Sequence, residues 1–200
     1  MQRHPYSAGA VKVAFWFQEF RTLVELLSEG KSFEDIKELN EQENIFGAST
    51  VTRKKQIFNT VSARVRCMDE SFVSIFMRCN VTAQKQLALA AVMAQDTLFF
   101  EFVYEVIHEK LVLCNYELTD ADMDKFFKHK QLQDERVSEW TEATLMRLGR
   151  TYKAILTEMS MLEKKRTSPR QIYAPMLDFS VEKWLQEHDL TEVVRALSDR

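Results

Sequence analysis

Three consecutive cations, Arg53, Lys54 and Lys55, follow Ser49 and Thr50 and could bind an anion. A hydroxyl oxygen of Ser49 or Thr50 can accept a free backbone N–H, which predicts the start of a helix. A helix N-terminus carries about half a positive charge, so cations there are disfavoured by roughly 0.3–1 kcal/mol each. A phosphate would reverse that sign, because free N–H groups and basic side chains would point at one anion. The alternative is a solvated helix without a ligand.

The basic segment 48–66 is predicted to be a helix with one packed face. Its apolar residues fall on one side at about 100° per residue, and its cations fall on the two polar flanks. The cations are therefore expected to lie in water, where they can reach phosphates. The DNA-contacting residues predicted on this helix are Arg53, Lys54, Lys55, Arg64 and Arg66.

A second set of cations lies in the last third of the chain. A helix is predicted within residues 137–162, as one helix or as two joined near Gly149, with basic residues opposite its apolar face. Together with a basic segment and Gln171-Ile172-Tyr173, it resembles a winged helix-turn-helix, in which a short basic hairpin follows the recognition helix. The alternative is a core helix with a solvated face and a charged loop. The DNA-contacting residues predicted here are Arg147, Arg150, Lys153, Lys164, Lys165 and Arg166.

The composition predicts an all-α, multi-helix globular protein. The chain has 200 residues with only 4 Gly and 3 Pro, so turn-forming residues are scarce and helix formers dominate. The formal net charge is −3, so binding of nucleic acid would have to come from a local basic patch. The aromatic-rich segment 97–114 could stack on bases, but its apolar residues nearly surround a helix, which favours packing in the core.

No catalytic or metal-binding motif is present in the sequence. It contains no HExxH, P-loop or GxSxG pattern, which favours a protein that is not an enzyme and has no cofactor or metal. The most apolar stretch, residues 87–106, is interrupted by carboxylates, so a buried helix is predicted rather than a membrane span. The three cysteines lack CxxC spacing and suit a reducing cytoplasm.

The most polar stretch of the middle, residues 128–136, is the predicted boundary between two lobes. The N-terminal lobe, residues 1–130, would carry the first basic helix. The C-terminal lobe, residues 131–200, would carry the small winged element.

These features together resemble the BrxA family, an all-helical component of BREX phage-defence systems. The resemblance is carried by S-T-x-x-R-K-K from Ser49 to Lys55 and by W-T-E-A-T-L-M-R-L from Trp140 to Leu148. A short acidic helix precedes the first motif, and a Pro-bounded basic tail follows the second. The resemblance extends from the first helix to Trp184.

The resemblance implies a cytoplasmic, non-catalytic protein with NusB-like and helix-turn-helix-like character. Its implied partners are double-stranded DNA and other BREX proteins, without a membrane. Two alternatives remain open: a protein–protein scaffold whose basic faces meet acidic partners, and a NusB-like RNA-binding protein. Little DNA sequence preference is expected, and the oligomeric state is unknown. Of the two basic faces, the helix with Arg53 and Lys55 is favoured, because only its position calls for an anion.

Overall fold

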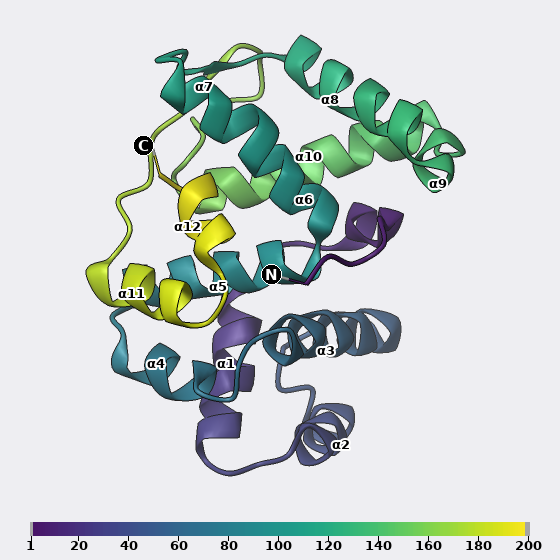
Figure 1. Cartoon of the computed structure of the whole chain (residues 1–200). Coiled ribbons are helices and arrows are strands. Elements are labelled where there is room, and N and C mark those ends of the chain that lie inside the picture. The colour runs from purple at the N-terminus through teal and green to yellow at the C-terminus, as the bar shows by residue number, and fades with distance from the viewer. Residues whose placement is uncertain (1, 199–200) are drawn as a thin grey trace. The chain divides into compact units, whose positions relative to one another are not determined.

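The computed structural model describes residues 2–198, which form two compact units (Figure 1). Unit 1 contains the residues up to Phe15 and those from Asp96 onward, and unit 2 contains Trp16–Gln95. Nearly all regular structure in both units is helical, which confirms the all-α prediction.

The two units do not coincide with the lobes expected from the sequence. The boundary expected near residue 130 falls inside unit 1. The physical reason for this difference is a shared aromatic core. The Phe102 ring packs edge-on against that of Phe126, with 5.4 Å between ring centroids, and it also stacks with that of Tyr152 at 5.7 Å. Residues on both sides of the polar stretch 128–136 therefore bury the same apolar surface, and the stretch is no linker.

Unit 2 is built around one largely buried helix. Most of the side chains of α5 are buried, including all those from Gln86 to Ala94. Helices α1, α3 and α4 pack with it, and α2 packs with α3. The bounds in this unit are α1 Phe17–Ser28, α2 Phe33–Glu43, α3 Val51–Arg66, α4 Phe72–Arg78 and α5 Val81–Gln95.

Unit 1 joins the N-terminal segment to the second half of the chain. Its 3-10 helix, Ala8–Lys12, packs on α10, where the Thr151 hydroxyl donates to the Ala10 carbonyl at 3.1 Å. Residues 97–112 form one continuous helical stretch with a π-helical centre, Val103–His108. The other bounds are α6 Thr97–Phe102, α7 Glu109–Val112, β1 Glu117–Leu118, α8 Asp120–Gln133, α9 Glu135–Ser138, α10 Glu142–Glu158, β2 Arg170–Gln171, α11 Phe179–Glu187 and α12 Thr191–Ala196.

Helix α10 is a single helix that runs through Gly149. A Cβ atom at that glycine would lie 3.1 Å from the Met123 side chain and 3.5 Å from that of Phe127, both on α8. The missing side chain thus lets α10 approach α8 closely. Tyr152 on α10 also packs on α6, where its ring lies 5.0 Å from that of Phe99. The aromatic segment 97–114 is accordingly part of the core, as predicted, although Tyr104 is 39% exposed.

The basic segment after α10 forms the expected short hairpin. Leu162 bridges Ile172, and the Glu163 N–H donates to the Gln171 carbonyl at 2.8 Å. On its other side, β2 pairs antiparallel with β1, with Glu117 opposite Gln171. The chain order here is a strand, α8, α9, α10 and the hairpin, with β2 in the middle of the small sheet.

Helix α8 begins at a capping box that also involves an ion pair. The Thr119 N–H and hydroxyl both donate to Asp122, and Lys110 lies 2.9 Å from the same carboxylate oxygen. Burial alone would raise the pKa of Asp122, but these hydrogen bonds outweigh it and hold the pKa below its usual value. The carboxylate form is therefore stabilised by folding.

Replacing Asp122 with alanine is expected to lower the free energy of unfolding by about 0.5–2 kcal/mol, because it removes one half of the capping box, an effect comparable to the loss of an N-cap side chain. A carboxyl group with a lowered pKa contributes stability above its ordinary value, near about 4, and loses it as the pH falls through the lower value. Denaturant unfolding at neutral pH should therefore show the difference, and it should shrink below about pH 3. The exposed Asp124→Ala variant on the same helix is the control and should unfold like the wild type.

Candidate nucleic-acid interface

The exposed face of α10 carries two arginines that point into solvent. Arg147 and Arg150 are exposed, and neither makes a hydrogen bond or ion pair with the part of the chain that the structure describes. Lys153, one turn further on, is different, because its ammonium group lies 2.9 Å from Asp120 and its side chain is 22% exposed. Thr141 caps the helix by accepting the Thr144 N–H at 3.3 Å. Two guanidinium groups are thus free to meet an anion or a base edge.

The hairpin of residues 161–173, called the wing below, adds a second group of cations. Residues 164–169 at its tip are all exposed. Lys165 lies 3.0 Å from Glu163, whereas Lys164 and Arg166 make no ion pair with any described residue. The Gln171 N–H donates to the Glu163 carboxylate at 3.1 Å, and this bond, followed by that with Lys165, lowers the pKa of Glu163. Glu163 is therefore ionised at neutral pH and holds the two sides of the wing together.

Two contacts hold the wing beside α8 and α10, and a third lies within the wing. The Arg170 guanidinium donates to the Glu163 carbonyl and, at 2.6 Å, to the Thr157 hydroxyl near the end of α10. At the tip, the Asp120 N–H donates to the Ser168 hydroxyl at 3.1 Å. Because Asp120 also pairs with Lys153, the wing and the basic face of α10 are joined through one residue. The second set of predicted residues is thus brought together on a defined surface.

Two of the three cations at the start of α3 have partners within the protein, contrary to the reasoning that favoured them. Thr50 is the N-cap, as predicted. The Arg53 guanidinium stacks over Trp16, 4.5 Å from the ring centre, and donates to Gln56 at 3.1 Å. The Lys54 ammonium donates to the Glu41 carbonyl near the C-terminus of α2, at 2.8 Å, where the helix dipole favours a cation. No anion is needed to explain these two residues.

The prediction that all the cations of α3 lie in water is wrong for Arg64, which is only 2% exposed. Its position follows from helical phase, because it lies seven residues after the buried Ile57 and therefore on the same face. Arg66 is exposed but lies over Phe33 at 4.3 Å and 3.8 Å from Glu34. Of the predicted residues of α3, only Lys55 is both exposed and without a partner among the described residues.

Helix α2, the neighbour of α3, also makes DNA binding through α3 unfavourable. Helix α2 packs on α3 and carries five exposed carboxylates. In a helix-turn-helix the first helix crosses the phosphate backbone, where negative side chains would be repelled. The second basic face, on unit 1, is therefore the better candidate. The carboxylates are Glu34, Asp35, Glu38, Glu41 and Glu43.

Sequence reasoning missed the apolar part of the α10 face. Met146 is 58% exposed and stands between the N-cap and the two arginines, and Ala143 and Ala154 are exposed as well. Met146 lies off the apolar stripe that contains Leu148 and Tyr152, and this departure from helical phase is the signal that could have identified it.

Among residues 2–198, no group of three or more His, Cys, Asp or Glu side chains is placed to hold a metal ion. No single helix in that range is long and apolar enough to cross a membrane. Helix α5 and residues 97–112 meet the length and composition criteria only as a bent pair.

The sequence pattern of the BrxA family matches residues 4–189, which is almost the whole chain. The chain belongs to the BrxA family. A BrxA-family relative named BREX protein BrxA, from Bacillus cereus (strain H3081.97), is 35% identical over 183 residues, which cover 92% of this chain and 86% of the relative.

The fold of this BrxA-family chain is similar to that of a solved protein. The crystal structure of an uncharacterized protein from Magnetospirillum magneticum matches with a TM-score of 0.82, over 98% of this chain and 99% of that one. At 19% identity, this likeness concerns the fold alone.

Proposed function

We propose that this BrxA-family chain is a non-catalytic component of a BREX system that binds double-stranded DNA through α10 and the wing. The observation that carries the proposal is the pairing of two free guanidinium groups on α10, Arg147 and Arg150, with a basic hairpin held beside them. Recognition helices enter the major groove, and basic side chains on flanking segments contact the phosphates.

The electrostatics of the chain agree with a local interface. The formal net charge is −3, so the protein as a whole is not attracted to DNA. Arg147, Arg150, Lys164 and Arg166 provide a local excess of unpaired positive charge on unit 1. Each phosphate that such a residue neutralises releases counterions, so the affinity must fall with salt.

The wing is expected to contribute phosphate contacts that are independent of sequence. Replacing Lys164 and Arg166 with alanine should lower the slope of log affinity against log salt by about 2, or about 0.9 per lost phosphate contact. Fluorescence anisotropy of a labelled duplex over a range of salt concentrations measures this slope.

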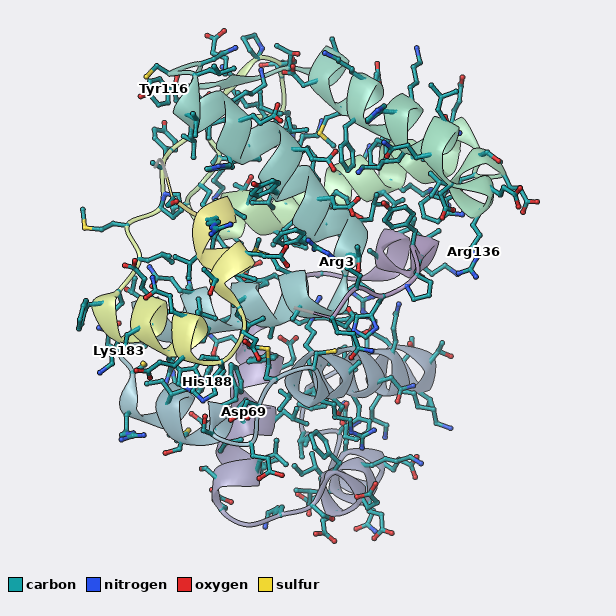
Figure 2. All side chains as sticks on the ribbon, in the orientation of Figure 1. Arg3, Asp69, Tyr116, Arg136, Lys183 and His188 are labelled. Carbon is teal, nitrogen blue, oxygen red and sulfur yellow. The ribbon has the colours of Figure 1, made fainter. Side chains whose placement is uncertain are left out.

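Lys183→Ala on α11 is the matched control for the wing. Its side chain is 61% exposed and lies at the outer edge of unit 1 (Figure 2), 3.8 Å from Glu187. The Lys183→Ala variant should show the same slope of log affinity against log salt as the wild type. An unchanged slope in the Lys164→Ala, Arg166→Ala variant would show that residues outside the wing contact the phosphates.

A second candidate function, contact with other BREX proteins, is favoured by exposed apolar residues after the wing. Met176 is 91% exposed and Phe179 is 78% exposed, which is unusual for large apolar side chains. Replacing both with aspartate should weaken co-purification with co-expressed BREX proteins and leave duplex binding intact. If duplex binding fails while co-purification persists, the residues act in DNA binding instead.

A further inference from the structure

The exposed face of α10 combines charge with apolar surface in a way that phosphate binding does not require. Met146 is 58% exposed beside Arg147 and Arg150, although the same helix buries Leu148 and Tyr152 completely. Contacts with phosphate oxygens come from cations and hydrogen-bond donors. An apolar side chain among them gains nothing from phosphates, but it can contact an apolar group on the edge of a base.

The order of side chains along this face suits the floor of the major groove. Ala143, Arg147, Arg150 and Ala154 follow at spacings of four, three and four, which places them on one stripe of the helix. The small residues at the two ends let the helix backbone come close to the bases. The arginines between them have long side chains without partners among the described residues, so both can reach base edges.

Each side chain type on this stripe has a matching group on DNA. Arginine donates two hydrogen bonds to O6 and N7 of guanine, which is the commonest base-specific contact. Apolar side chains contact the C5-methyl group of thymine in the major groove. RNA offers neither partner to a helix, because its major groove is deep and narrow and uracil lacks the methyl group.

We propose that α10 reads bases in the major groove, with Arg147 and Arg150 on guanine and Met146 with Ala143 on the methyl group of thymine. This inference rests on the proposed DNA binding and goes beyond it. It replaces the expected lack of sequence preference with selectivity for sites that contain both guanine and thymine. The wing would then supply affinity for any sequence, and α10 would supply the discrimination.

The test begins with selection of duplexes from a randomised library by the full chain. The best duplex is then rebuilt with deoxyuridine in place of thymidine, which removes only the methyl groups, and with 7-deazaguanine in place of guanine, which removes only N7. Each replacement is expected to weaken binding by the wild type about fivefold or more, since a good base contact discriminates at this level.

Variants of the protein identify which side chain contacts the thymine methyl group and which contact guanine N7. Met146→Ala should bind the thymidine and deoxyuridine duplexes nearly equally. Arg147→Ala with Arg150→Ala removes the donors that would reach guanine N7, so its affinities for the guanine and 7-deazaguanine duplexes should be nearly equal. Lys164→Ala in the wing is the control and should weaken all three duplexes by the same factor.

Two results would overturn the inference. Selection that enriches no sequence, with equal affinity for all three duplexes and a steep salt dependence, would reject base reading and leave the proposed DNA binding intact. A complete lack of duplex binding would reject both the inference and the proposed function.

Discussion

Reversing the charge of Arg147 and Arg150 to glutamate is expected to weaken binding of duplex DNA by about 100-fold or more, which corresponds to roughly 2.7 kcal/mol. Both residues are exposed on α10 and have no partner among the described residues, so they are available to DNA. The change removes two contacts worth about 1–3 kcal/mol each if they reach bases, and it adds repulsion from the phosphates. A mobility-shift or anisotropy titration measures the loss.

The fold of this variant should be intact, which separates binding from stability. Glutamate is a good helix former, and neither arginine packs in the core. Lys183→Glu on α11 changes the net charge in the same direction, away from the interface, and should bind DNA within about threefold of the wild type. If Arg53→Glu with Lys55→Glu abolished binding while the α10 variant bound normally, α3 would be the DNA-binding helix.

Replacing Lys130 with alanine is expected to destabilise the protein by about 3 kcal/mol. The Lys130 side chain is 3% exposed, and its ammonium group lies 2.6 Å from the carboxylates of both Glu101 and Glu105. The Tyr6 hydroxyl also donates to Glu101 at 2.7 Å, and burial together with this carboxylate raises the pKa of Tyr6. Without the lysine, the carboxylate of Glu105 would repel that of Glu101, whose side chain is only 19% exposed. Because Glu105 is 35% exposed, the cost lies at the low end for a buried pair.

Thermal unfolding measures this effect directly. A loss of about 3 kcal/mol should lower the Tm by roughly 6–12 °C in a protein of this size. Lys128→Ala, an exposed lysine on the same helix, is the matched control and should change the Tm little. A Tm equal to that of the wild type in Lys130→Ala would show that the buried cluster contributes no net stability.

Local features of the fold could be predicted from the sequence, because they depend on neighbouring residues. The cap at Thr50 and the buried aromatic residues of segment 97–114 follow from residue type and helical period. The wing was indicated by a basic segment after a helix, and the hairpin is present. Burial of Arg64 could also have been predicted, since it shares the phase of Ile57.

Contacts between distant segments could not be predicted in the same way. The stack of Arg53 on Trp16 joins α3 to the N-cap of α1, and neither residue type nor spacing indicates it. The hydrogen bond from Thr151 to the Ala10 carbonyl spans 141 positions and brings the N-terminal segment into unit 1. Such contacts determine which cations have partners within the protein. They are the reason that the basic face of α10, and not that of α3, is the better candidate for DNA binding. The NusB-like character and a cytoplasmic location stay predictions.

The most direct measurement is the affinity of the wild type for a short labelled duplex between about 50 and 200 mM salt, with the Arg147→Glu, Arg150→Glu variant and an RNA hairpin alongside. Binding through α10 and the wing predicts that the wild type prefers duplex DNA and that its affinity falls steeply with salt. It also predicts that the variant binds weakly throughout this range. Equal affinity of variant and wild type, affinity that barely responds to salt, or a preference for the RNA would contradict it.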